Sequence, residues 1–432
     1  MKNKNYNEFV AYLESLQMMP KSMPGLEKIK KALDLTDWYP NINPEKVIVI
    51  AGTNGKGTTA AALESMLIGA GFKVGLYTSP HLISTTERIR LNGKIISDDL
   101  FLEVGLKLEP LIKKCQLSHF ESLTLMAGHI FFQMNDLDFS IFEVGLGGLF
   151  DATNAYPHQF SVITKIGLDH QNILGYSLVE IAKNKLGIIH KNNTVFHHQV
   201  QPELKSEFNK AIEKSHSTVI PLDKVTSQFH YTNDSEFPVW SVVFNKEVYP
   251  INLMGERAVE NIQTAMTVFN HIARKFNLNQ ILVKQAYSKL NHIFWRGRLE
   301  KIYITSVNYP VLISGDHNEQ GMKSLFSILK FFKTKTFHLI IGFGHDKEMK
   351  FLADWIKEFE AETKVQINLH LTRTPFKGRS LSEYPNDLIQ LAKIKNENII
   401  QLLNEIVPKK DELVLITGSL YLVGKVLEFE KK

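Results

Sequence analysis

The stretch that most constrains the fold of this chain is VIVIAGTNGKGTT, from Val47 to Thr59. It runs from β-branched apolar residues into glycines, one lysine and two threonines, and an alanine-rich segment from Ala60 to Ala70 then ends at Gly71. This order predicts a buried strand, a tight loop, a helix and a glycine at the helix end. Backbone N–H groups of such a loop point inward and act together with the helix dipole. We therefore expect an anion site suited to a phosphate chain.

Two side chains of this loop have the chemistry of a nucleotide site. Lys56 would reach the outer phosphates, and the Thr58 hydroxyl would bind Mg²⁺. The strict phosphate-loop pattern requires Ser or Thr directly after Gly-Lys. Here Gly57 intervenes, and the early glycine, Gly52, lies closer to the lysine than that pattern asks. From the motif alone, a glycine-rich turn without a ligand therefore stays open.

Length and composition exclude several classes of protein. The 432 residues exceed the usual size of a single hydrophobic core, so we expect two domains. No apolar run approaches the roughly 20 residues of a membrane span, and the N-terminus lacks the apolar core of a signal peptide. The single cysteine, Cys115, rules out an internal disulfide and fits a reducing cytoplasm. The net charge of +5 suits polyanionic small substrates as well as nucleic acid, and no concentrated Lys/Arg block favours the latter.

Further predicted strands end in residues that can bind a metal ion. Glu143 ends a hydrophobic strand before three glycines, where a phosphate-loop fold places the acid that holds nucleotide Mg²⁺. His170 follows a predicted strand over 160–167, and Ser79 follows one over 73–78. An isolated Glu is usually solvated, a lone His is usually structural, and Ser-Pro is usually just a turn. Beside a phosphate loop, we favour metal roles for Glu143 and His170.

The rest of the chain alternates strands and helices around a hinge. A long helix over 255–275 contains Asn261, and the hinge is expected at 294–300. Beyond it we predict strands at 310–314, 337–342, 365–371 and 412–417, with helices near 320–331, 347–359, 383–394 and 419–429. This pattern indicates a second, smaller parallel sheet wrapped by helices. We expect an ATP-binding domain over residues 1–295 and a Rossmann-like domain over 296–432.

Together, these motifs resemble the folylpolyglutamate synthase and dihydrofolate synthase family of the Mur ligase superfamily. The resemblance rests on Ala51-Gly52-Thr53-Asn54-Gly55-Lys56-Gly57-Thr58, Ser79-Pro80-His81-Leu82, Phe120-Glu121 with Thr124, Glu143 to Gly148, Asp151-Ala152-Thr153-Asn154, Ile166-Gly167-Leu168-Asp169-His170, Gly297-Arg298, Gly315 with His317-Asn318, Asp346-Lys347 and Gly418-Ser419-Leu420-Tyr421. The offset phosphate loop is the form that this family uses. Cell-wall ligases of the superfamily carry a UDP-binding domain ahead of this loop, whereas here only 51 residues precede Gly52. The short Pro24-Gly25-Leu26 lead-in resembles the folate branch.

The resemblance implies an α/β fold with a mainly parallel phosphate-loop ATPase domain and ATP-dependent amide bond formation. A pteroate or folate carboxylate would attack the γ-phosphate of ATP, and the amine of L-glutamate would then attack the acyl phosphate. The implied substrates are dihydropteroate, tetrahydrofolate glutamates or both. The implied cofactors are ATP, Mg²⁺ at two sites and a monovalent cation such as K⁺. A cytoplasmic monomer without nucleic-acid or membrane partners is the family expectation, with closure of the two domains during turnover.

Residue by residue, the resemblance assigns metal, nucleotide and substrate roles. Thr58, Ser79 and Glu143 would hold one Mg²⁺, Glu143 and His170 a second, and a carbamylated Lys185 would supply an oxygen ligand near it. The nucleotide contacts would be Gly52, Thr53, Asn54, Gly55, Lys56, Gly57, Thr58, Asn261, Arg298 and Asp316. The substrate contacts would be Ser79, Pro80, His81, Phe120, Glu121, His317, Lys347 and Ser419. For Glu121, stabilisation of its helix N-terminus is the alternative from the residues alone.

The chain also departs from the family pattern at nucleotide-contact positions. The family has Asp where Ser314 stands, and Asp316 two positions on could replace its charge. The other departures are Leu149-Phe150 for Arg-Leu, Asn184 for Glu, Leu186 for Ala, Glu256-Arg257 for His-Gln and Arg296 for Pro. Three hypotheses therefore stay open: a folate-branch ligase, a related ligase for another carboxylate and amino acid, and an inactive nucleotide-binding scaffold. A scaffold would need few of the family's catalytic residues, so it is disfavoured by the retention of Lys56, Thr58, Glu143, His170 and Lys185.

Overall fold

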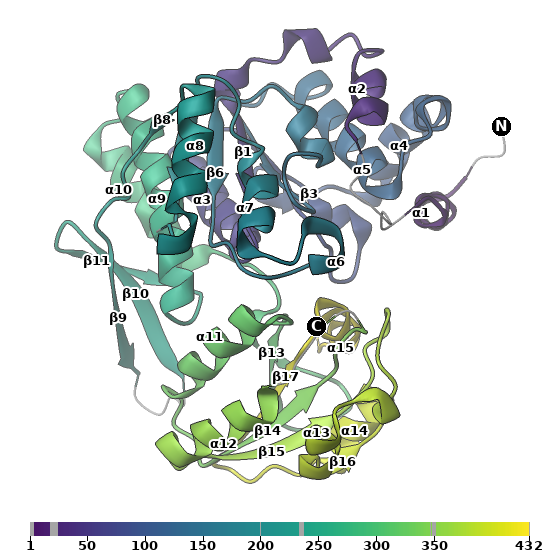
Figure 1. The fold of residues 1–432 in the computed structure, drawn as a ribbon, viewed down its shortest axis with the longest axis vertical. Helices are drawn as coiled ribbons and strands as arrows, with labels where there is room; N and C mark the ends of the chain where they lie inside the picture. Colours follow the sequence, from purple (N-terminus) through teal and green to yellow (C-terminus); the bar gives the residue numbers. More distant parts are fainter. Residues whose placement is uncertain are drawn as a thin grey trace. The chain divides into compact units, whose positions relative to one another are not determined.

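The computed structural model describes residues 4–17, 25–198, 200–232, 237–345, 347 and 351–431. The described residues form two compact units (Figure 1). The first contains the chain up to residue 225 together with 258–293, and the second contains 226–257 together with the chain from 294 onward. Pro24 and Asp346, both part of the motifs above, lie outside the described residues. The functional division expected between residues 295 and 296 stays a prediction.

The first unit is built on a large, mainly parallel sheet. Its strands are β1 Val47–Ala51, β2 Val74–Tyr77, β3 Ile89–Leu91, β4 Lys94–Ile95, β5 Phe139–Glu143, β6 Phe160–Ile163, β7 Thr194–His197 and β8 Thr218–Val219. They lie in the order β4-β3-β2-β5-β1-β6-β7-β8. Strands β2, β5, β1, β6, β7 and β8 are parallel, whereas β3 and β4 add an antiparallel edge. The C-terminal ends of β2, β5, β1 and β6 therefore meet at one edge of the sheet, where ligands of open α/β sheets bind.

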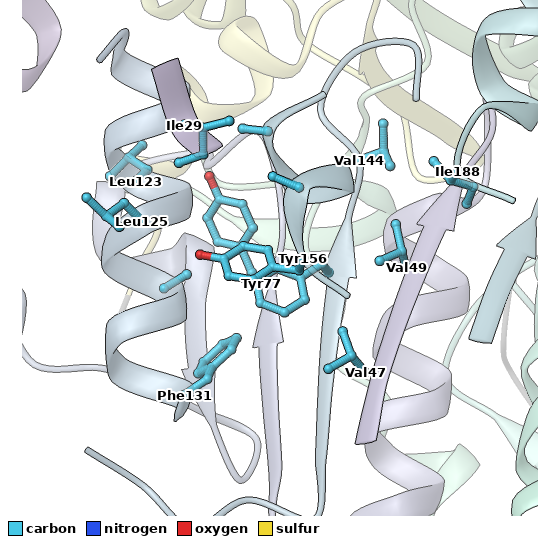
Figure 2. Close-up of a cluster of buried hydrophobic side chains, with 14 of the residues drawn as sticks. Ile29, Val47, Val49, Tyr77, Leu123, Leu125, Phe131, Val144, Tyr156 and Ile188 are labelled. Carbon is cyan, nitrogen blue, oxygen red and sulfur yellow. The ribbon is translucent and has the colours of Figure 1, made fainter. Parts of the chain in front are cut away.

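Helices accompany this sheet in the first unit. They include α1 Tyr6–Ser15, α2 Glu27–Leu33, α3 Lys56–Gly69, α4 Asp98–Cys115, α5 His119–Gly128, α6 Gln171–Leu174, α7 Leu178–Leu186, α8 Lys205–Ser215, α9 Glu256–Lys275 and α10 Gln280–Ser288. The first two residues of α9 belong to the second unit. Tyr77 and Tyr156 belong to the same buried cluster as Leu123 and Leu125 of α5 (Figure 2). Tyr156 stacks on Phe142 of β5 with ring centroids 4.7 Å apart, and its hydroxyl donates to the buried Thr124 carbonyl. The β5 strand that ends in Glu143 is thus fixed by packing.

The second unit contains two sheets. Strands β9 Thr226–Tyr231, β10 Pro238–Phe244 and β11 Glu247–Ile251 form an antiparallel sheet in the order β11-β10-β9. Strands β12 Arg298–Tyr303, β13 Pro310–Ser314, β14 Thr336–Ile341, β15 Gln366–Leu371, β16 Ile394–Lys395 and β17 Glu412–Thr417 form the other, in the order β12-β13-β17-β14-β15-β16. Only β12 is antiparallel to its neighbour among these described strands. The helices are α11 Glu319–Leu329, α12 Leu352–Thr363, α13 Asn386–Leu391, α14 Ile399–Glu405 and α15 Leu420–Leu427.

The expected α/β architecture with mainly parallel sheets is confirmed. Strands predicted at 310–314 and 412–417 have the predicted ends, and β14 and β15 start within one residue of theirs. The sequence reading missed the antiparallel β12 and the short α14. Within the part of the chain that the structure describes, no helix is both long and apolar enough to span a membrane.

Candidate active site

At two positions of the loop after β1, Gly52 and Gly55, a side chain would clash with neighbouring residues. A Cβ on Gly52 would approach Thr164 Oγ1 to 1.8 Å, and one on Gly55 would approach Asn261 Oδ1 to 2.1 Å. Gly55 also has φ +92° at the N-cap of α3, a backbone conformation that side chains disfavour. The loop therefore passes directly over β6 and against Asn261 of α9.

Two N–H groups of the loop are bound within the protein, so they do not contribute to the anion site that we expect there. The N–H groups of Thr53 and Asn54 donate to the Lys165 carbonyl at 2.9 and 3.3 Å, and Thr53 Oγ1 donates to the Gly167 carbonyl at 2.9 Å. These bonds tie the loop to the segment after β6. The N–H groups at the start of α3 have no partner within the helix, because the first turn of any α-helix leaves them unpaired. An anion would therefore lie at the first turn of α3, from Lys56 onward.

Lys56 and Lys185 converge on the same carbonyl of this loop. Lys56 Nζ donates to Gly52 O at 3.1 Å and to Thr53 O at 3.3 Å, and Lys185 Nζ of α7 donates to Gly52 O at 2.9 Å. Lys185 is only 4% exposed. Burial, together with the Lys56 charge, lowers the pKa of Lys185 to about 7. The lysine that the family resemblance assigned to carbamylation thus lies beside the phosphate loop.

Glu143 lies at the end of β5, at the edge of the sheet where β2, β5, β1 and β6 all end. Register pairing places it beside Ile50 at the end of β1, and its Oε2 accepts the Ser79 N–H at 3.2 Å. The side chain is 4% exposed, and Thr58 of the neighbouring helix start is also buried. The structure therefore brings a carboxylate from β5 together with the loop after β2, next to the end of β1.

The donors at this edge fit Mg²⁺. Thr58 and Ser79 offer hydroxyl oxygens and Glu143 offers a carboxylate, which are the hard oxygen ligands that this ion prefers. No group of three His, Cys, Asp or Glu side chains suited to a metal occurs within the described ranges. A Mg²⁺ ion would therefore depend on the hydroxyls and on nucleotide phosphates, as is common for this metal.

His170 lies on the loop after β6, at the start of α6. It has φ +49°, in the left-handed region, and its N–H donates to Asp169 Oδ1 at 2.8 Å. Its Nε2 is 3.9 Å from the same carboxylate oxygen. Strand β6 ends at the same edge of the sheet as β5, so His170 lies on a loop of the edge that carries the predicted metal residue Glu143.

The loop after β2, which carries Ser79 and His81, is shaped by two residues of the following turn. The Glu87 carboxylate accepts the N–H groups of residues 82, 83 and 84 at 2.8, 3.0 and 2.8 Å. Arg88 Nε donates to His81 Nδ1 at 2.9 Å. Burial and the Arg88 charge lower the pKa of His81 to about 3, so this imidazole is neutral at physiological pH.

Glu87 and Arg88, which hold this loop, were not identified from the sequence. The signal for Glu87 was present, because Ser84 and Glu87 have the Ser-x-x-Glu spacing of a capping box. Arg88 had no comparable local signal.

Phe120 and Glu121 lie in the first turn of α5. Phe120 packs so closely on Gly145 that a Cβ there would meet its ring at 2.7 Å, and its ring centroid lies 5.8 Å from that of Tyr77. Glu121 forms a capping box with Ser118, accepting its N–H at 2.8 Å and its hydroxyl at 2.6 Å. Glu121 therefore has the structural role that we considered as an alternative, and its predicted contact with substrate stays a prediction.

In the second unit, the predicted residues gather at the C-terminal ends of β13, β14 and β17. His317 follows β13 and its Nδ1 lies 2.8 Å from the Gly315 carbonyl. Ser419 caps α15 after β17, accepting the Tyr421 N–H at 3.1 Å and the Thr374 hydroxyl at 2.9 Å. Lys347 lies after β14, where its carbonyl accepts from Arg379. Arg298 begins β12 opposite Ser314.

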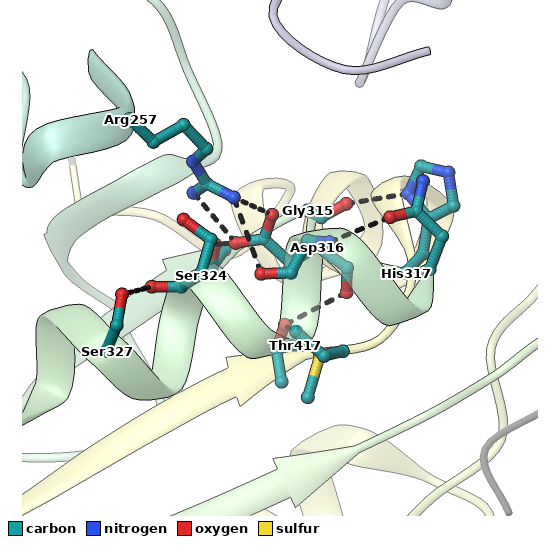
Figure 3. A network of polar contacts seen from close by, with 11 residues as sticks. Arg257, Gly315, Asp316, His317, Ser324, Ser327 and Thr417 are labelled. Carbon is teal, nitrogen blue, oxygen red and sulfur yellow. Dashed lines mark hydrogen bonds and ion pairs between the residues drawn. The ribbon is translucent and has the colours of Figure 1, made fainter. Parts of the chain in front are cut away.

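Asp316 is held in an internal ion pair (Figure 3). Arg257 donates to both oxygens of the carboxylate, with Nη2 3.0 Å from Oδ2, and the Ser314 hydroxyl donates to Oδ2 at 2.6 Å. Burial alone would raise the pKa of Asp316, but the Arg257 guanidinium, Ser314 and the Arg298 charge outweigh it and lower that pKa. Ser314 and Arg257 thus contact the same carboxylate, and the predicted contact of Asp316 with the nucleotide stays a prediction.

Comparisons with known proteins show which family and which fold this chain is similar to. The family model described as Mur ligase middle domain matches residues 50–269. The chain is 31% identical over 436 residues to a dihydrofolate synthase/folylpolyglutamate synthase of Bacillus subtilis, covering 93% of this chain and 94% of the relative. It is 27% identical over 442 residues to a folylpolyglutamate synthase of Lacticaseibacillus casei, covering 98% of each. A solved structure of E. coli FolC in complex with DHPP and ADP matches with a TM-score of 0.78 at 25% identity, covering 99% of this chain and 97% of that one.

Proposed function

Because the chain belongs to the dihydrofolate synthase/folylpolyglutamate synthase family of the Mur ligase superfamily, we propose that it joins L-glutamate to a pteridine carboxylate at the expense of ATP. The observation that supports this most is the sheet edge where Lys56 and Lys185 both bind the Gly52 carbonyl of the loop after β1 and Glu143 ends the neighbouring strand β5. The acceptor is dihydropteroate, a tetrahydrofolate glutamate, or both. Relatives with names for either activity align over nearly the whole chain.

The proposed reaction has two steps. A carboxylate oxygen of the pteridine substrate attacks the γ-phosphorus of ATP, which breaks the bond to the β-phosphate oxygen and releases ADP. The amine of L-glutamate then attacks the acyl carbon of the acyl phosphate, loses a proton and expels phosphate, leaving an amide. A carboxylate is a poor electrophile, and phosphorylation supplies its leaving group. The protein's contribution is positioning and charge neutralisation.

The chain's own residues divide these tasks. The first turn of α3 and Lys56 bind the phosphates, and Arg298 offsets charge on the transferred phosphoryl group. Glu143, with the hydroxyls of Thr58 and Ser79, would hold Mg²⁺, which supplies further charge neutralisation when bound. The shaped loop after β2, held by Glu87, presents Ser79 and His81 to the substrate.

Lys185 acts as a carbamate in this proposal. Carbamylation joins the neutral amine to CO₂ with loss of one proton, and burial, by lowering the Lys185 pKa to about 7, raises the neutral fraction. A carbamate would bring a negative oxygen to the metal-binding edge, whereas an ammonium there would repel the metal. The His170 ring would complete the second metal site.

We further propose a cytoplasmic monomer that acts on small molecules and not on nucleic acid. The single cysteine, Cys115, is buried and fits a reducing compartment. The net charge of +5 is mild and would suit either kind of partner, but the sequence has no concentrated Lys/Arg block of the kind that favours nucleic acid.

Phosphate release with separate acceptors tests which reaction occurs. Purified protein receives ATP, Mg²⁺ and L-glutamate with dihydropteroate or with tetrahydrofolate, and products are identified by mass. Release with dihydropteroate alone makes it a dihydrofolate synthase, release with tetrahydrofolate alone a folylpolyglutamate synthase, and release with both a bifunctional enzyme. Folded protein that binds ATP but releases phosphate with neither acceptor would contradict the proposal and favour a ligase for another carboxylate. Folded protein that does not bind ATP would favour the inactive scaffold.

A further inference from the structure

Arg88 and His81 are joined by a hydrogen bond that can run in only one direction. Arg88 Nε donates to His81 Nδ1 over 2.9 Å. A guanidinium carries only N–H donors and stays charged in proteins, so it cannot be the acceptor. The Nδ1 atom must therefore offer a lone pair. The ring proton of His81 then lies on Nε2, because a neutral imidazole has one donor nitrogen and one acceptor nitrogen.

The surroundings keep this bond in place. Arg88 is only 8% exposed, so water has little access to its guanidinium. Its carbonyl accepts the Thr78 N–H at 2.9 Å, which ties the residue to the end of β2. His81 itself is only partly buried, and within the described residues no hydrogen bond is made at its Nε2. The imidazole thus turns its acceptor to Arg88 and has its donor left for a ligand.

The path of the loop does not depend on this bond. The Glu87 carboxylate accepts the N–H groups of residues 82, 83 and 84, which follow His81 directly. Ser84 and Glu87 also form a capping box over the same turn. Glu87 therefore shapes the backbone of the loop, whereas Arg88 contacts the imidazole. The two neighbouring residues control separate properties: the course of the chain and the nitrogen that carries the ring proton.

We propose that Arg88 is a positioning residue for His81: by donating to Nδ1 it keeps the ring proton on Nε2, so that His81 meets an oxygen of the pteridine substrate as a hydrogen-bond donor. This inference rests on the proposed function, in which His81 contacts the pteridine substrate. The loop that carries His81 leaves β2 at the edge where β5 and β1 also end. A carbonyl or carboxylate oxygen is the group that such a donor recognises, because these oxygens accept hydrogen bonds.

Nitrogen-15 NMR reads the state of the ring directly and needs no enzyme activity. The protein is labelled at its histidines, and the His81 signals are identified as those that are missing from His81→Phe. In the wild type, Nδ1 should have the chemical shift of an unprotonated ring nitrogen and Nε2 that of a protonated one. Arg88→Met removes every donor of this side chain. Its two His81 signals should move toward each other, because both tautomers are then populated.

Kinetics test whether the Nε2 donor serves the substrate, with dihydropteroate and with tetrahydrofolate as acceptors. His81→Phe should raise the KM for the pteridine roughly three- to tenfold, the effect of one hydrogen bond, and leave the KM for ATP unchanged. Arg88→Met should raise the pteridine KM about threefold. The double variant should be no worse than His81→Phe, since both changes act on the same donor. Lys94→Gln, an exposed cation on β4, is the matched control and should keep both KM values.

These readouts separate the inference from the proposed function. A wild-type His81 with its proton on Nδ1, or an unchanged tautomer in Arg88→Met, would overturn the role of Arg88. An unchanged pteridine KM in either single variant, or effects that multiply in the double variant, would overturn the coupling of this donor to the substrate. Thermal melting reports folding; if Arg88→Met does not fold, the wild-type spectrum and the pteridine KM of His81→Phe decide by the same criteria. A wild type inactive with both acceptors would instead overturn the proposed function.

Discussion

Replacing Glu143 by Ala should abolish ATP-dependent phosphate release while leaving the fold intact. Glu143 ends β5 at the ligand edge, beside Ile50 and next to Ser79, and it is the carboxylate that we assign to both Mg²⁺ sites. Loss of a metal-holding carboxylate removes charge neutralisation at the phosphoryl group, so we expect a fall in kcat of about 10³-fold or more.

Two further variants test whether the loss of activity comes from the loss of the Glu143 charge. Glu143→Gln keeps the side-chain volume and an acceptor for the Ser79 N–H but loses the charge, so it should be nearly as inactive as the alanine variant. Glu103→Ala removes an exposed carboxylate from α4 and should retain wild-type rates. Melting temperatures of all three identify loss of folding. A folded Glu143→Ala enzyme with substantial phosphate release would show that the metal assignment is wrong.

Replacing Lys185 by Ala should also remove activity, and a small carboxylate should restore part of it. The truncated side chain leaves space beside Gly52, where Lys185 Nζ now donates at 2.9 Å. If the native group is a carbamate, formate or acetate in that space supplies an equivalent oxygen ligand. We expect a loss of about 10²-fold or more, with a several-fold gain on adding the carboxylate.

The control for this experiment lies on the same helix. Lys183 has a side chain 62% exposed, so Lys183→Ala should keep its activity and gain nothing from formate. Methylamine should not rescue Lys185→Ala, because an ammonium repels the metal. Rescue by methylamine instead of by formate would mean that Lys185 acts as a cation and that the carbamate is wrong.

The sequence was most informative where one local pattern decides the structure. The apolar run from 310 to 314 and the run from 412 to 417 are buried parallel strands flanked by turns, and such strands are recognisable from their residues alone. Glu143 was placed correctly at a strand end, because a single charged residue followed by glycines marks where a buried strand stops. The metal roles of Glu143 and His170 stay predictions.

Features that depend on distant residues could not be read in this way. Arg257 and Asp316 are 59 positions apart, and no local sequence pattern around either residue predicts that they form an ion pair. The N–H groups of Thr53 and Asn54 bind Lys165 more than a hundred residues away, so the loop presents fewer donors to a ligand than its glycines suggested. The antiparallel β12 was missed because the residues of an edge strand are half-exposed and lack a continuous apolar run.

The central claim is that a substrate carboxylate is activated as an acyl phosphate, and an oxygen-transfer measurement tests it most directly. The pteridine acceptor is prepared with ¹⁸O in its reacting carboxylate and incubated with enzyme, ATP, Mg²⁺ and L-glutamate. We predict that each phosphate released carries one ¹⁸O atom, because that oxygen bridges carbon and phosphorus in the intermediate and leaves with phosphorus. Amide product accompanied by unlabelled phosphate would contradict this account.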